Sequence, residues 1–124
     1  MPPSAPYQFL GVRFRGRPPH RLRTLENYRI ELPHRHGVPT GQRFFDVGRY
    51  FDDETDLTRP VGALVGWAER VTSADALRAQ SIRVYARVTD SAPGFGFVPT
   101  PRTLGRIAAI GAYLDVSAYT SSED

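Results

Sequence analysis

The pattern that most constrains the fold lies in the last third of the chain, where a helix pattern separates two strand patterns. Residues 82–88 alternate apolar and polar side chains, and residues 113–119 repeat this period of two. Such a period is typical of a strand with one buried face and one polar face. Between them, Thr100 suits a helix N-cap, Pro101 suits the first helical position, and Gly111 suits the stop. We therefore expect a strand, a capped helix and a second strand, in that order.

Apolar residues at helical spacing predict two main helices. The first begins near Pro60, and its apolar stripe is Val61, Leu64, Val65, Ala68 and Val71. The second is the capped helix, with a stripe of Leu104, Ile107, Ala108 and Gly111 and with Ile110 beside it. After the first helix, Ser73 is predicted to cap a short further turn through Leu77 and Ala79.

The first half of the chain predicts three strands, over residues 7–14, 27–32 and 44–51. In the third, Phe45, Val47 and Phe51 share one side, and Gly48 suits a β-bulge. The resulting order of elements predicts an α+β fold, with a mostly antiparallel sheet and two main helices packed on one face.

Length and composition predict one domain over residues 1–124, with residues 1–6 and 120–124 as flexible tails. The chain has no cysteine, which excludes disulfides, thiolate metal sites and a cysteine nucleophile. No apolar run approaches the roughly 18 residues of a membrane-spanning helix, so we expect no membrane partner. Because the N-terminus also lacks a signal-peptide pattern, a cytoplasmic protein is the expectation.

All 16 basic residues are arginine, and their charge is unevenly spread. The net charge is +6 over residues 1–43, −4 over residues 44–75 and +1 over residues 76–124. A GC-rich genome explains a lysine-free chain, and selection for the bidentate guanidinium is the functional alternative. The two charged regions can neutralise each other in the fold or present a dipolar surface to a partner.

Two sets of residues are candidate binding surfaces. The first is an arginine-rich N-terminal segment interleaved with Phe14, His20 and Tyr28, a composition that phosphates and bases can recognise. Its members are Arg13, Arg15, Arg17, Arg21 and Arg23. The alternative for this set is a solvated basic loop.

The second set lies on the polar side of the last two predicted strands. Its members are Arg83, Tyr85, Arg87, Tyr113 and Tyr119, with Asp115 among them. Arginine and tyrosine are enriched at protein–protein interfaces. The alternative is ordinary cross-strand pairing, with Arg against Asp and Arg over Tyr.

No pattern predicts catalysis, a metal site or a cofactor. His34 and His36 could share a metal on one strand face, but no third ligand is near in sequence. The acidic residues 52–56 lack the glycine and glutamate positions of a calcium loop, and residues 94–97 do not complete a phosphate-binding glycine motif. We expect the aromatic residues Phe95 and Phe97 to pack onto the core instead. An enzyme is therefore the less favoured class.

One stretch resembles a known family. Pro93 to Thr100 reads Pro-Gly-Phe-Gly-Phe-Val-Pro-Thr, and it precedes the capped helix, Gly111 and the strand over residues 113–119. This run resembles the C-terminal signature of a bacterial family called domain of unknown function 4279, mainly over residues 82–119. Residues 36–40, His-Gly-Val-Pro-Thr, are similar to its Gly-Ile-x-Pro-Thr element. The resemblance implies an α+β fold and a binding role, because some members are suspected immunity-type or interaction proteins.

Together these observations predict a non-catalytic bacterial binding protein that acts through protein–protein interaction, in immunity or defence. The alternative is a nucleic-acid-binding protein that uses the N-terminal arginines.

Overall fold

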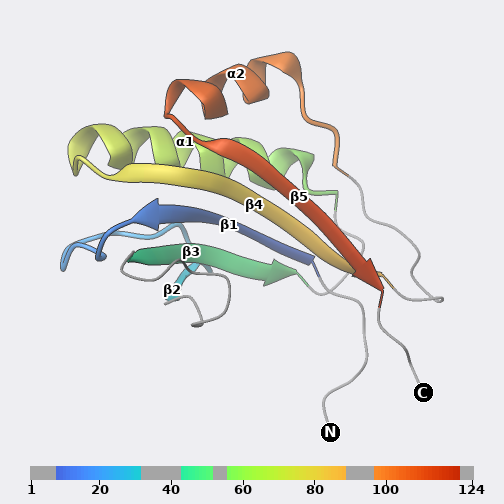
Figure 1. The fold of residues 1–124 in the computed structure, drawn as a ribbon, viewed down its shortest axis with the longest axis horizontal. Coiled ribbons are helices and arrows are strands. Elements are labelled where there is room, and N and C mark those ends of the chain that lie inside the picture. Colours follow the sequence, from blue (N-terminus) through green and yellow to red (C-terminus); the bar gives the residue numbers. More distant parts are fainter. Residues whose placement is uncertain (1–7, 32–42, 52–55, 89–96, 121–124) are drawn as a thin grey trace, which may run out of the picture.

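A computed structural model describes residues 8–31, 43–51, 56–88 and 97–120 of the chain. They form a five-stranded sheet with two helices packed against it, which confirms the predicted α+β fold (Figure 1). The elements are β1 (Gln8–Arg15), β2 (Arg29–Glu31), β3 (Phe44–Phe51), α1 (Thr58–Ala74), β4 (Arg78–Val88), α2 (Pro101–Ala109) and β5 (Tyr113–Thr120).

The strand order in the sheet is β2-β3-β1-β4-β5. The pairs β2–β3, β3–β1 and β1–β4 are antiparallel, whereas β4 and β5 are parallel. Parallel strands need a crossover connection, and α2 lies in the one between β4 and β5. The sheet is therefore mostly antiparallel, as predicted, and β5 forms one end of it.

Helix α1 covers the sheet with the apolar stripe that the sequence predicts. The side chains of Val61, Leu64, Val65, Ala68 and Val71 are all buried. They join a core with alternate residues of β1 and β4, which are Leu10, Val12, Phe14, Ile82 and Val84. Burying one such side chain is worth about 1.5–3 kcal/mol, so this layer stabilises the centre of the sheet.

The segment that follows β1 is tied to α1 through Trp67. The indole Nε1 donates a hydrogen bond of 2.8 Å to the carbonyl oxygen of Arg23, and the ring meets Phe14 edge to face at 5.7 Å. A buried indole needs a partner for its N–H. This bond therefore holds the arginine-bearing segment beside the helix layer.

Helix α2 has the termini that the sequence predicts. Thr100 Oγ1 accepts a hydrogen bond from the Thr103 backbone N–H at 3.2 Å, and Gly111 follows the helix with φ of +78°. The apolar stripe is only partly buried, because α2 packs at the end of the sheet against α1 and β5. Ile107 is buried, whereas Leu104 is 41% exposed and Ala108 is exposed.

Two local predictions are wrong. Ser73 lies inside α1, and the chain turns at Ala76 with φ of +54° before β4 begins at Arg78, so no further helical turn forms there. Gly48 is not at a bulge, because it pairs directly with Gly11 in an unbroken β1–β3 register. The irregularity is in the β1–β4 pairing, between Arg13 and Phe14.

Other predictions concern loops and the chain ends. Phe97 packs against the core, as expected, whereas Phe95 lies outside the described residues. Strand β5 includes Thr120, the first residue of the segment predicted as a C-terminal tail.

Candidate interaction face

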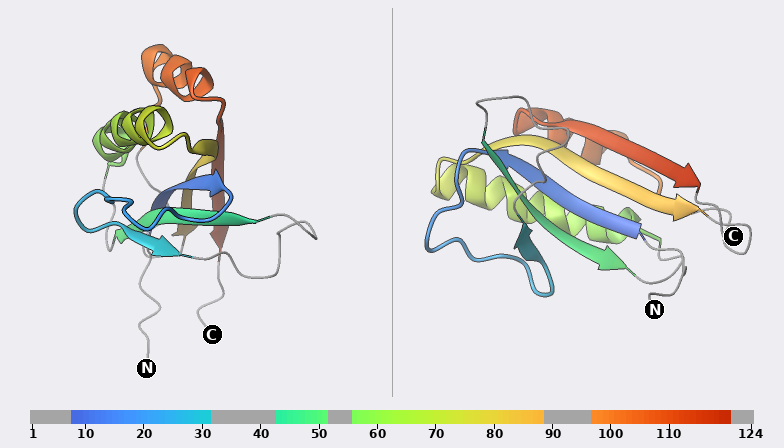
Figure 2. Two further views of the ribbon diagram at one scale, coloured as in Figure 1. Left: turned by 90° about the vertical axis from the view of Figure 1, so that its left-hand side faces the viewer. Right: turned by 60° about the horizontal axis from the view of Figure 1, so that its bottom comes forward.

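The sheet has one face turned away from both helices, which we call the open face. In Figure 2 the helices lie behind the strands when the sheet is seen from this side, and the described residues place no helix in front of it. Directly paired residues share a face, so the strand registers assign its members. They are Phe9, Gly11, Arg13, Arg15, Arg29, Glu31, Phe44, Asp46, Gly48, Tyr50, Ser81, Arg83, Tyr85, Tyr113, Asp115 and Ser117.

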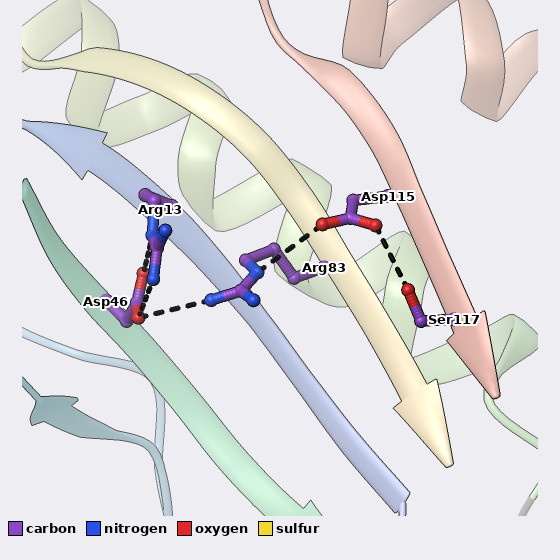
Figure 3. A network of polar contacts seen from close by, with 5 residues as sticks. All are labelled: Arg13, Asp46, Arg83, Asp115 and Ser117. Carbon is purple, nitrogen blue, oxygen red and sulfur yellow. Dashed lines mark hydrogen bonds and ion pairs between the residues drawn. The ribbon is translucent and has the colours of Figure 1, made fainter. Parts of the chain in front are cut away.

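An ionic network crosses four strands of the open face (Figure 3). Arg13 on β1 binds Asp46 on β3 at two points, with Nε–Oδ1 at 2.9 Å and Nη2–Oδ2 at 3.1 Å. Arg83 on β4 lies between two carboxylates, with Nη1 3.5 Å from Asp46 Oδ2 and Nε 3.7 Å from Asp115 Oδ2. Ser117 Oγ donates to Asp115 Oδ1 at 3.3 Å. Two arginines and two aspartates thus balance in charge.

The Arg13–Asp46 pair is the least solvent-accessible part of the network. Their side chains are 18% and 9% exposed, and the hydrogen bond with Asp46 holds the pKa of Arg13 above its ordinary value. A bidentate pair fixes the orientation of both groups, because two parallel hydrogen bonds must form at once. The centre of the open face is therefore rigid and polar.

An aromatic cluster adjoins the network. The Phe9 ring stacks on Tyr85 with centroids 4.8 Å apart and an interplanar angle of 20°, and it meets Tyr50 at 5.0 Å. Phe9 is 2% exposed, and its ring lies over the facing glycines of β1 and β3. A Cβ on Gly11 would lie 2.8 Å from Phe9 Cζ, so only glycine leaves room for the ring there. The Arg83 guanidinium carbon lies 5.6 Å from the Tyr85 centroid.

Two tyrosines on the open face keep large solvent-accessible surfaces. Tyr50 on β3 is 49% exposed, and Tyr113 at the start of β5 is 56% exposed. They flank the ionic network on opposite sides, because the registers place Tyr50 level with Phe9, before Arg13 on β1, and Tyr113 before Asp115 on β5, level with Ser81 and Arg13. A hollow of about 450 Å³ lies beside Tyr50, lined by Asn27, Arg29, Glu31, Gly48, Arg49 and Tyr50.

The described members of the predicted strand-face set, Arg83, Tyr85, Tyr113 and Asp115, come together on the open face. The parallel register places Tyr113 beside Ser81 and pairs Arg83 with Asp115, which is the cross-strand pairing expected as the alternative for this set. The backbones of Arg87 and Tyr119 pair with each other in the same ladder. The side chains of these last two residues lie outside the described part of the structure.

The predicted arginine segment does not form one surface. Arg13 and Arg15 are on the open face, where Arg13 binds Asp46 and Arg15 Nε donates to Gln80 Oε1 at 2.6 Å. The other three, Arg17, Arg21 and Arg23, are exposed in the segment between β1 and β2. The set therefore divides between the sheet and a loop.

Sequence reasoning did not select Asp46, Phe9 and Tyr50 for this site. Asp46 alternates with the buried Phe45 and Val47, which signals a side chain on the opposite face. Its position beside Arg13 depends on the β1–β3 pairing, and no local pattern shows that pairing. Phe9 has no such signal, since apolar residues occur on both faces of β1.

Among the described residues, no group of three or more His, Asp or Glu side chains could hold a metal ion. His20 is exposed, and His34 and His36 lie outside the described residues. No helix in the described part of the chain is long and apolar enough to cross a membrane.

Comparisons of this chain with protein-family models, curated proteins and solved structures found no match. The resemblance to the domain of unknown function 4279 family therefore stays a prediction.

Proposed function

We propose that this protein is a non-catalytic binding protein, and that the open face of its sheet docks on another protein. The observation that carries the proposal is the placement of Tyr50 and Tyr113, about half exposed, on either side of a fixed Arg–Asp network. Tyrosine and arginine are among the residue types that most often dominate interface energies.

The network supports this function because it is organised before any partner arrives. Arg83 is held between Asp46 and Asp115, and its side chain still has 23% of its surface exposed. A side chain that is already ordered loses little conformational entropy on binding, so more of the contact energy contributes to affinity. The exposed rings add rigid apolar contact with a polar tip.

The charge balance of the network favours a polar protein surface as the partner. Its two arginines are matched by two carboxylates, so the centre of the face carries no excess positive charge for phosphates. We further propose, from the family resemblance alone, a bacterial role in immunity or defence.

Nucleic-acid binding is the second candidate, and the exposed Arg17 and Arg21 favour it. Arg13 and Arg15 weigh against it, because both guanidinium groups already bind side chains of the sheet. Phosphate contacts release counterions, so such binding must weaken steeply with added salt.

The test is capture from a lysate of the source cells on four immobilised baits. They are the wild type, Tyr50→Ala, Tyr113→Ala and the control Val98→Ala, since Val98 is 68% exposed and outside the open face. We expect a protein that the wild type and the control retain and that both tyrosine variants lose. Equal retention by all four baits contradicts the proposal. Nuclease-sensitive capture that falls steeply with salt supports nucleic-acid binding instead.

A further inference from the structure

Strand β5 also has an outer edge, where its backbone is separate from the side chains that it contributes to the open face. Strand β5 is the last in the sheet, and within the described residues it pairs only with β4. In a strand at the end of a sheet, every second residue turns its backbone N–H and C=O away from the neighbouring strand. These groups form a ready template for another strand.

The sequence of β5 and its register with β4 lack several features that normally prevent such pairing. Its eight residues, YLDVSAYT, include no proline, no glycine and no basic residue, and its register with β4 runs without a bulge. Its one charged side chain, Asp115, lies on the open face beside Arg83. Natural sheets usually protect an exposed edge with charges, prolines, bulges, short strands or a covering helix or loop. Helix α2 contacts β5, so this last device is present in part.

The opposite edge of the same sheet is protected. Strand β2 has three residues, and two of them, Arg29 and Glu31, are charged. So short a strand offers few backbone groups to a partner. Of the two end strands, β5 therefore offers more backbone groups to a partner strand than β2 does.

The helix side of β5 also has uncovered apolar surface. Val116 is 47% exposed there, and Leu104 on the neighbouring α2 is 41% exposed. Figures 1 and 2 show α2 alongside β5 at this end of the sheet. A strand added to β5 would cover part of this surface, so backbone pairing and apolar burial would act together.

We propose that β5 pairs antiparallel with β5 of a second copy of this chain, about a two-fold axis at Val116. A second copy of the chain is the proposed partner because β5 is complementary to itself. In this register Val116 meets Val116 of the second copy, Leu114 meets Ala118, and Asp115 meets Ser117, whose hydroxyl can donate to a carboxylate. Faces also match, because each pair lies on one side of both sheets.

The competing register about Asp115 is unfavourable. It would place the two Asp115 carboxylates directly opposite each other, and like charges in that position destabilise a strand pair. The register about Val116 avoids this contact. The two five-stranded sheets become one continuous sheet, whose open faces lie on the same side.

Light scattering after size-exclusion chromatography, over a range of protein concentrations, tests the association. We expect the wild type to approach twice the chain mass of 13.9 kDa. Val116→Lys places two ammonium groups together and should weaken association by at least about tenfold. The matched control Val98→Lys adds the same charge at a residue that is 68% exposed and should associate as the wild type does. A wild type that keeps the single-chain mass at every concentration overturns the proposal.

Cross-linking tests the register and does not depend on the lysine variant folding. The chain has no cysteine, so one introduced thiol is unique. Under mild oxidation, Val116→Cys should form a disulfide-linked dimer much faster than Ser117→Cys or Val98→Cys. Equal rates for all three, or fastest coupling of Ser117→Cys, would refute pairing about Val116. Failure of this dimer leaves the open-face proposal intact, because the capture experiment tests Tyr50 and Tyr113, which the cross-linking variants leave unchanged.

Discussion

Arg13 and Asp46 join β1 to β3 through a two-point ion pair, with Nε–Oδ1 at 2.9 Å and Nη2–Oδ2 at 3.1 Å. The pair sits directly opposite in the strand register, so backbone pairing already places the two groups within reach. Arg83 then extends the pair across β4 to β5. The same contacts that order the open face also contribute to the stability of the sheet.

Removing the central carboxylate should therefore destabilise the protein. We expect Asp46→Ala to lower the free energy of unfolding by about 2 kcal/mol, because Arg13 loses its partner in a largely desolvated position. Asp115→Ala is the matched control, and its cost should stay below about 1 kcal/mol because the Asp115 side chain is 39% exposed. Urea unfolding measures both. Equal costs for the two variants would show that Asp46 is not the centre of the network.

The glycine under the Phe9 ring should not tolerate a methyl group. A Cβ on Gly48 would overlap the Phe9 ring, so we expect Gly48→Ala to cost about 1–3 kcal/mol. Gly62 is the control, because it lies within α1 and a Cβ there meets nothing within 4 Å. Gly62→Ala should stabilise the protein by about 0.5–1 kcal/mol. Thermal unfolding of both variants measures these changes. An unchanged stability for Gly48→Ala would contradict the position of the Phe9 ring over Gly48.

The two tyrosines of β4 and β5 should respond differently to truncation. Tyr85 stacks on the buried Phe9, so Tyr85→Ala should lower stability by about 1–3 kcal/mol. Tyr113 is 56% exposed, and Tyr113→Ala should change stability by less than about 0.5 kcal/mol. Urea unfolding compares them. A large loss for Tyr113→Ala would mean that this ring is structural.

Alkaline pH should destabilise the fold through Tyr28. Burial raises the pKa of Tyr28 from 10.0 to about 12, although the charge of Arg49 acts in the opposite direction. The folded state therefore favours the neutral phenol, and this contribution is complete below pH 10 and is lost as the pH rises from 10 to about 12. Unfolding free energies over that range should fall less for Tyr28→Phe than for the wild type. Parallel curves would assign the loss to other groups.

The features of the fold that could be predicted from the sequence are those that depend on neighbouring residues in the chain. The cap at Thr100, the stop at Gly111 and the alternation of β5 all act within a few residues, and all are present in the structure. The prediction of a bulge at Gly48 was wrong. The glycine instead leaves space for the ring of Phe9, which is distant in the sequence.

Part of the candidate site could be predicted because the alternation within a strand is visible in the sequence, whereas the pairing between strands is not. Alternation alone assigns Arg83, Tyr85 and Tyr113 to the polar side of their strands, and the structure keeps them there. The contribution of β3 depends on the β1–β3 register, so Asp46 and Tyr50 could not be placed from local pattern. The arginine segment divides because β1 ends at Arg15, and the residues after it leave the sheet.

The affinity of the captured protein for Tyr113→Ala, measured by titration calorimetry against Val98→Ala and the wild type, tests the open-face proposal most directly. The account predicts that Tyr113→Ala weakens binding by at least about tenfold, or 1.4 kcal/mol. It also predicts that Val98→Ala binds as the wild type does and that both variants keep the wild-type unfolding free energy. Wild-type affinity for Tyr113→Ala and for Tyr50→Ala would place the binding surface elsewhere and contradict the account.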